Sequence, residues 1–116
     1  MDEPVISSDA PRRMLRWPVA IVVDSAKGQA VYHGATLEIS ISGCTVLCDS
    51  NLPSRHPVDL VIFLPPIAKD AVRVTLQVKA KISSTVLSNR HKQFLCSLHF
   101  DKFAGTGRAT LEQLLR

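Results

Sequence analysis

The sequence of 116 residues predicts an all-β fold, a six-stranded antiparallel barrel with one helix at its C-terminal end. Three observations lead to this prediction. Six segments have the composition or the alternation of β-strands, turn-forming residues separate them, and only the last residues have the spacing of an amphipathic helix. Hydrophobic residues make up 46% of the chain and charged residues 21%, a balance typical of a globular domain rather than a disordered chain.

The beginning of the chain differs from the rest in composition. Residues 1–11 are polar, acidic and contain two prolines, so we expect a flexible tail there and assign residues 12–116 to a single domain. The formal net charge is +4, and the position of the acidic tail makes the remaining domain still more basic. A basic domain attracts phosphates or acidic surfaces, although charge alone does not identify the partner.

A cluster of basic residues follows the tail. Arg12, Arg13 and Arg16 lie directly before Trp17 and Pro18. Proline disfavours the helical conformation in the residue that precedes it. We therefore expect the three arginines to lie on an extended lead-in to the first strand.

The first two strands are predicted before residue 43. A β-branched run at 19–23 predicts the first strand, and the polar residues at 24–28 predict a turn. Residues 36–42 alternate between polar and apolar types, which predicts a second strand. Its odd-numbered residues are expected in the core, so that Glu38 and Ser40 lie together on the polar face.

The remaining four strands follow in order. Gly43 interrupts the alternation, which predicts a turn or bulge before a third strand at 44–48. The fourth strand, at 58–64, is a continuous apolar run closed by two prolines. Residues 72–82 show the most regular alternation and predict a long, half-buried fifth strand. A polar turn separates it from the sixth strand, at 94–100, so these two strands are expected to form a hairpin.

The last segment is the predicted helix. Thr106 can cap its N-terminus, and Leu111, Leu114 and Leu115 have the i, i+3 and i+4 spacing of one helical face. We expect these leucines to cover the barrel.

The arginine cluster is the first candidate binding element. A guanidinium presents a planar fork of donors that can bind a phosphate, or the O6 and N7 edge of guanine, with two hydrogen bonds. Arg12, Arg13 and Arg16 on a flexible segment could close over an anionic ligand that carries guanine. A solvated basic flank remains the alternative for this motif taken alone.

The second candidate element is the polar face of residues 38–43. The Glu38 carboxylate can accept hydrogen bonds from N1–H and N2–H of guanine, and the Ser40 hydroxyl can reach a phosphate or a ribose. An ordinary amphipathic strand remains the alternative for this element taken alone.

Together the two elements resemble the signature of the PilZ domain family. That signature pairs an RxxxR motif ahead of the first strand with a [D/N]xSxxG motif near the second, matched by Arg12 and Arg16 and by Ser40 and Gly43. Glu38 stands where the family has Asp or Asn. The order of the strands and the terminal helix also agree with the family's barrel, so the resemblance covers most of the chain.

The resemblance implies binding of cyclic di-GMP (c-di-GMP), a bacterial second messenger. By position, the ligand would contact Arg12, Arg16, Ser40 and Gly43, with Arg13 assisting and Glu38 replacing the family's shorter acceptor. The additional methylene of Glu38 predicts a lower affinity. The implied mechanism is that binding orders the arginine segment and regulates a downstream protein partner that the sequence does not identify.

Catalytic and metal sites are not predicted. The chain has three cysteines, an odd number that does not suit a disulfide scaffold, and its first residues do not resemble an export signal. We therefore expect a cytoplasmic protein whose cysteines are reduced thiols, buried as small hydrophobic residues. Cys96 and His99 lie three apart in a strand and face opposite sides, which does not suit zinc. No nucleophile motif or phosphate-binding glycine loop is present, so we expect neither an enzyme nor a cofactor.

Other partner classes fit the sequence less well. Single-stranded nucleic acid would need aromatic platforms on polar faces, but aromatic residues are only 5% of the chain. Membrane insertion is not expected, since no apolar run approaches about 18 residues. The remaining alternative to a c-di-GMP receptor is a PilZ-like protein-interaction module that does not bind nucleotide.

Overall fold

The computed structural model describes residues 12–25, 28–52, 57–65 and 74–116. The predicted tail at 1–11 therefore lies outside the described residues. The same holds for the middle of the predicted turn at 24–28 and for the first residues of the strand predicted at 72–82.

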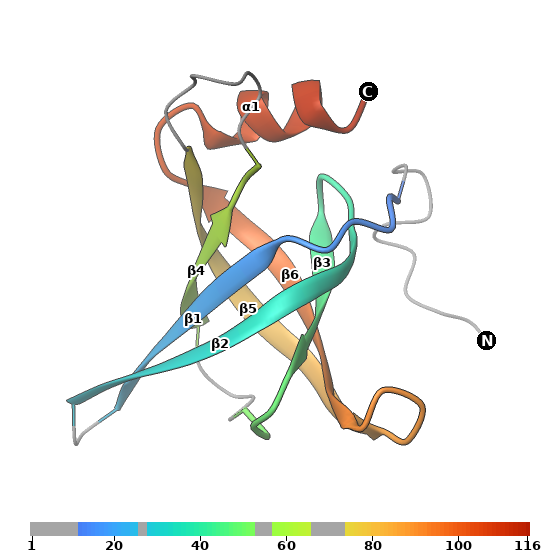
Figure 1. Cartoon of the computed structure of the whole chain (residues 1–116). Coiled ribbons are helices and arrows are strands. Elements are labelled where there is room, and N and C mark those ends of the chain that lie inside the picture. The colour runs from blue at the N-terminus through green and yellow to red at the C-terminus, as the bar shows by residue number, and fades with distance from the viewer. Residues whose placement is uncertain (1–11, 26–27, 53–56, 66–73) are drawn as a thin grey trace.

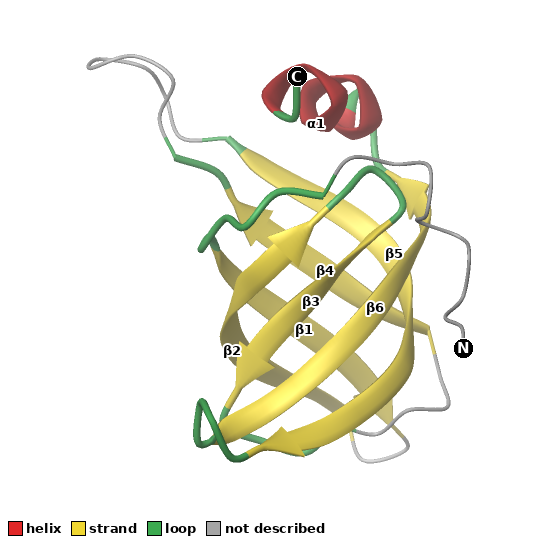
Figure 2. Ribbon diagram, turned by 90° about the vertical axis from the view of Figure 1, so that its right-hand side faces the viewer, coloured by secondary structure: helices red, strands yellow, loops and turns green. Residues whose placement is uncertain are grey.

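Six antiparallel strands close into a barrel, and one helix lies across one of its ends (Figures 1 and 2). The order around the barrel is β1-β2-β3-β6-β5-β4. This architecture confirms the predicted fold class. The elements are β1 Pro18–Ser25, β2 Gly28–Ile39, β3 Gly43–Cys48, β4 Pro57–Phe63, β5 Thr75–Ser88, β6 Gln93–Phe103 and α1 Gly107–Leu114.

The core fills the barrel because alternate residues of each strand point inward. Leu60 and Ile62 of β4 have no exposed surface, and Val46 of β3 is equally enclosed. The helix adds the leucines that its spacing predicted, with Leu111 and Leu115 buried in the core cluster. Thr106 occupies the N-cap position of α1, but its side chain makes no capping hydrogen bond.

The second strand departs from the prediction. It begins at Gly28 and already ends at Ile39, and its register against β3 shifts between Thr36 and Glu38. This bulge accommodates Leu37 as an extra residue and changes the phase of the strand. As a result Thr36 is fully buried. The expectation of one uninterrupted alternation over 36–42 was therefore wrong.

The β5–β6 hairpin confirms the predicted pairing but is longer than predicted. Its turn spans residues 89–92, and β5 continues to Ser88 rather than ending at Ile82. Its pairing contains one register shift between Lys79 and Ala80 and a further one, a bulge in β5, between Ile82 and Ser84. Because this bulge adds a residue, Ser83 and Ser84 are both exposed.

The three cysteines are free and buried, as predicted. Burial raises the pKa of the Cys96 thiol to about 11 and raises the pKa of Cys44 further. The thiols therefore stay protonated near neutral pH and pack as small apolar groups. Among the described residues, no group of His, Cys, Asp and Glu side chains is arranged to hold a metal ion. The described part of the chain also contains no helix that is long and apolar enough to span a membrane.

Candidate functional site

The segment that carries the arginines, residues 12–17, lies alongside the end of β2, and we call it the leader. The Arg13 N–H donates to the Ile39 carbonyl at 2.9 Å, and the Ile39 N–H donates to the Arg13 carbonyl at 2.9 Å. This reciprocal pair makes the leader an extended continuation of β1 along β2. The predicted extended lead-in is confirmed for these residues.

Thr36 fixes the point where the leader enters β1. Its hydroxyl accepts the Trp17 N–H at 2.9 Å and donates to the carbonyl of Leu15. The Thr36 N–H donates to the Trp17 carbonyl at 2.9 Å. Because Thr36 is fully buried by the bulge in β2, these bonds are shielded from water. The bulge thus determines the path of the leader.

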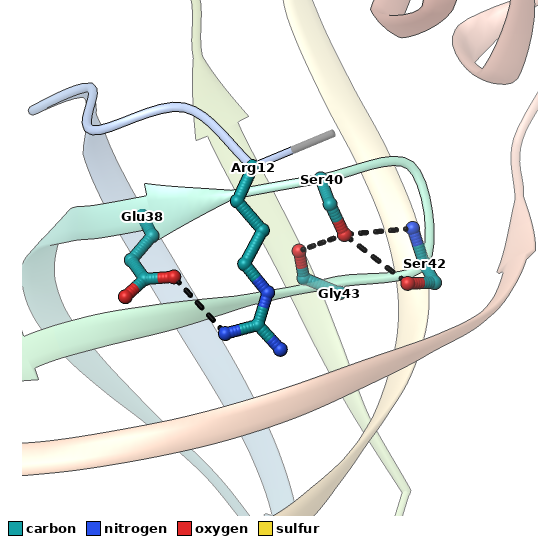
Figure 3. Close-up of polar contacts among 5 residues, drawn as sticks. All are labelled: Arg12, Glu38, Ser40, Ser42 and Gly43. Carbon is teal, nitrogen blue, oxygen red and sulfur yellow. Dashed lines mark hydrogen bonds and ion pairs between the residues drawn. The ribbon is translucent and has the colours of Figure 1, made fainter. Parts of the chain in front are cut away.

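Arg12 reaches from the leader to Glu38 of β2. Figure 3 shows the Arg12 side chain crossing β2, so that its guanidinium lies between Glu38 and the turn that follows the strand. Arg12 Nη1 is 3.2 Å from Glu38 Oε1, and the two side chains are 52% and 30% exposed. An ion pair with this exposure contributes at most about 1 kcal/mol to stability. The contact is therefore weak enough to exchange for a ligand.

Ser40 organises the turn that joins β2 to β3. Its N–H donates to the Gly43 carbonyl at 2.9 Å, and its hydroxyl lies 3.4 Å from the same oxygen. The hydroxyl also accepts the Ser42 N–H at 3.2 Å and lies 3.1 Å from the Ser42 hydroxyl (Figure 3). Ser40 is only 2% exposed. The prediction of an open strand face at this position was wrong, because Ser40 shapes the turn from within.

Gly43 allows β3 to approach β6 closely. It is the cross-strand partner of His99, and a Cβ on Gly43 would lie 2.4 Å from the carbonyl oxygen of Leu98. No side chain fits at this separation without a shift of the β6 backbone. The spacing between Ser40 and Gly43 thus produces a tight turn followed by a close strand contact.

These elements surround a depression of about 360 Å³ on the outer face of the barrel. Four predicted residues line it, namely Arg12, Glu38, Ser40 and Gly43. The remaining two arginines are not among its lining residues. Arg16 is exposed, and Arg13 Nη2 donates to the Leu115 carbonyl at the end of α1 at 3.0 Å.

The far wall of the depression was not predicted. Ser83 and Ser84 of β5 and Ser97 and His99 of β6 line it, together with Thr45 of β3. The Ser83 hydroxyl donates to the Ser97 carbonyl at 3.1 Å and ties the bulge in β5 to β6. The loss of alternation after Ile82 was the available signal, since a bulge turns side chains onto a new face.

Comparison with models of known protein families identifies the family of this chain. A family model for the PilZ domain matches residues 10–116. The chain belongs to the PilZ domain family. Comparison with curated proteins gives no match.

Solved structures share the fold of this PilZ domain at low sequence identity. The Bacillus subtilis inhibitor of motility (MotI/DgrA) matches with a TM-score of 0.73 and 16% identity, over 92% of this chain and 48% of the other. The K. pneumonia MrkH–c-di-GMP complex matches with a TM-score of 0.60 and 17% identity, over 92% and 50%. The PilZ domain with c-di-GMP of YcgR from Escherichia coli has a TM-score of 0.54 and 10% identity, over 92% and 87%. The chain thus spans about half the length of the first two proteins.

Proposed function

We propose that this PilZ domain is a receptor for c-di-GMP that binds the nucleotide without changing it chemically. The observation that carries the proposal is the meeting of Arg12 with Glu38 beside the Ser40–Gly43 turn, around one depression. The site combines a cation for phosphate or guanine with a carboxylate for the guanine N1–H and N2–H. Two solved structures of the same fold are c-di-GMP complexes.

Binding is an exchange of partners in this proposal. The Arg12 guanidinium leaves the Glu38 carboxylate and turns to the ligand, and the carboxylate then accepts from guanine. Arg16, which is exposed on the same leader, closes over the ligand from the solvent side. Each charge-assisted hydrogen bond contributes about 1.5–3 kcal/mol, which compares with about 1–2 kcal/mol for ordering one residue of the leader. The free energy gained from several such hydrogen bonds is therefore close to the free energy needed to order the leader. Ligand binding can thus change how well the leader is ordered.

Arg13 links the leader to α1, through which the leader can affect a partner protein. Its backbone pairs with Ile39 beside the site, and its guanidinium binds the Leu115 carbonyl at the end of α1. A cation at this position also interacts favourably with the C-terminal end of the helix dipole. A leader that moves with the ligand would change the seating of α1, whose exposed face is then available to a partner. We place this signalling in the cytoplasm, where buried thiols remain reduced.

Calorimetric titration with c-di-GMP tests the proposal. We expect the wild-type protein to bind, Arg16→Ala to lose at least about tenfold in affinity, and Glu38→Asp to bind as tightly or more tightly. Arg90→Gln removes a charge in the exposed turn of the β5–β6 hairpin and serves as the matched control. Absence of binding to the wild-type protein would contradict the proposal.

A second candidate function is a PilZ interaction module that does not bind nucleotide. The observation that favours it is that the Glu38 carboxylate is already paired with Arg12 and is one methylene longer than aspartate. The same titration separates the two, because this module would give no heat with c-di-GMP for the wild-type protein. Binding that appears only in Glu38→Asp would show that the longer side chain prevents it.

Hydrogen exchange tests the proposed route through Arg13. We expect c-di-GMP to slow exchange of the amides of residues 12–16 and to change exchange of the amides of α1. In Arg13→Gln, the change in the leader should remain and the change in α1 should disappear. An equal response of α1 in both proteins would show that Arg13 does not couple the two.

A further inference from the structure

The outer face of the barrel carries two basic side chains on the side away from the leader: His99, which lines the depression, and its neighbour Lys81, which lies beyond the lining residues. We call this pair the basic edge. His99 of β6 and Lys81 of β5 are direct cross-strand partners, and Gly43 of β3 is the partner of His99 on its other side. The residues that flank His99 and Lys81 along their strands are buried, including Leu98 and Ala80. His99 and Lys81 therefore both project outward, since side chains alternate along a strand.

The basic edge lies opposite Arg12 across the strand order. From the leader the order is β2, β3, β6 and β5, so His99 lies three strands away. Neighbouring strands are about 4.8 Å apart, which places the backbone at His99 about 14 Å from the leader. The Arg12 side chain extends across β2 into this interval, and Arg12 and His99 line the same depression, so a ligand seated there can contact both side chains.

Lys81 differs from the neighbouring Lys79 in its ion pairs. Lys79, two residues before Lys81, forms an ion pair with Asp59 at 2.6 Å. Among the described residues no carboxylate lies within ion-pair distance of Lys81, which is exposed. His99 is half-buried and lines the depression beside the hydroxyls of Ser84 and Ser97. The edge thus offers an ammonium and an imidazole donor next to neutral hydroxyl groups.

We propose that His99 and Lys81 form a second anion subsite, which binds the phosphodiester of the cyclic dinucleotide that lies away from the leader. The inference rests on the proposed function. A cyclic dinucleotide carries two phosphodiesters on opposite sides of one ring, so a surface that binds both needs donors at both ends. Arg12 supplies one end, and the basic edge supplies the other. The two ends together distinguish a cyclic dinucleotide from a mononucleotide, which has a single phosphate and cannot engage both.

The test compares c-di-GMP binding by the wild-type protein, by the double variant Lys81→Gln/His99→Gln, and by Arg90→Gln. The double variant should lose about tenfold in affinity at low salt and clearly less at 0.5 M salt, because salt screens exposed charges. Arg90→Gln, which removes one charge far along the same hairpin, should stay within about twofold of the wild-type protein. Lys81→Arg should retain most of the affinity, since it keeps the charge on the edge.

The outcomes separate the two proposals. Failure of the wild-type protein to bind c-di-GMP overturns the proposed function, and the subsite with it. Binding by the wild-type protein together with an unchanged double variant overturns only the subsite. Thermal unfolding of each variant shows whether it is folded. If the double variant is unstable, Lys81→Gln alone decides, with an expected loss of about threefold against no loss in Arg90→Gln.

Discussion

The interior of the barrel and its outer face between the leader and β5 are built from the same strands but by different rules. Inside, side chains follow the simple alternation of β-strands, and residues such as Leu60 and Ile62 are fully enclosed. Outside, the depression lies between two interruptions of that alternation, the bulge before Glu38 and the bulge before Ser84. Regular alternation therefore forms the barrel, and its interruption at these two bulges forms the walls of the depression.

The two bulges act on different walls of the depression. The first buries Thr36 and lets its hydroxyl hold the leader, which places Arg12 beside Glu38. The second exposes both Ser83 and Ser84 on the side of β5 that faces β6. Bulges of this kind commonly redirect side chains next to binding sites. Changes inside the barrel should therefore affect stability, whereas changes at the bulges should affect both stability and binding.

The largest effect is expected for Leu60→Ala in the interior. Truncation of a fully buried leucine leaves a cavity and should lower the free energy of unfolding by about 2–5 kcal/mol, as measured by urea denaturation. Because Leu60 lies inside the barrel on β4, which is opposite β3 in the strand order and contributes no residue to the depression, the affinity for c-di-GMP of the folded protein should change less than about twofold. Val86→Ala, at a side chain that is 56% exposed, is the control and should cost at most about 0.5 kcal/mol. A large loss of affinity for c-di-GMP in folded Leu60→Ala would contradict the expectation that the interior affects stability and not binding.

Thr36→Val tests the bulge in β2. The valine has nearly the same shape but removes the hydroxyl, so the Trp17 N–H and the Leu15 carbonyl lose their partner. We expect a loss of about 1–3 kcal/mol in the free energy of unfolding, together with weaker binding of c-di-GMP, since the leader is released. Thr75→Val, at the exposed start of β5, is the matched control. Amide hydrogen exchange locates the effect. If the variant has wild-type stability and its amide exchange is faster only outside the leader, Thr36 does not hold the leader in place.

The smallest effect is a pH dependence that comes from the interior. Burial raises the pKa of the Cys96 thiol from 9.0 to about 11. The unfolded chain therefore loses this proton at a lower pH than the folded chain, and stability falls as the pH rises above about 9. Cys96 should account for a loss of about 0.8 kcal/mol in the free energy of unfolding between pH 8 and 9.5. Cys96→Ala should reduce this slope, and an unchanged slope in the variant would contradict the assignment.

Much of the barrel could be predicted from the sequence because its interior depends on local alternation. The hairpin of the last two strands and the terminal leucines follow directly from periodicity. The first half of β2 was not predicted, since residues 28–33 show no regular alternation of polar and apolar side chains and depend on pairing with β1. The bulges were missed for a related reason, because an extra residue is defined only by the partner strand.

The candidate site was predicted only in part. The motif residues Arg12, Glu38, Ser40 and Gly43 meet around one depression, but Ser40 serves the turn rather than an open face. Arg13 lies beside Arg12 in an extended segment, where neighbouring side chains point in opposite directions, and this geometry explains why it reaches α1. The far wall depends on the pairing of β3 with β6, which connects strands distant in sequence.

We expect the outer face between the leader and β5 to bind c-di-GMP. An NMR titration that follows the backbone amides tests it most directly. We expect saturable shifts at Arg12, Glu38, Gly43, Ser97 and His99, with little change along the outward residues of β4, such as Val61. Shifts confined to other faces of the barrel, or no shifts at saturating c-di-GMP, would contradict it.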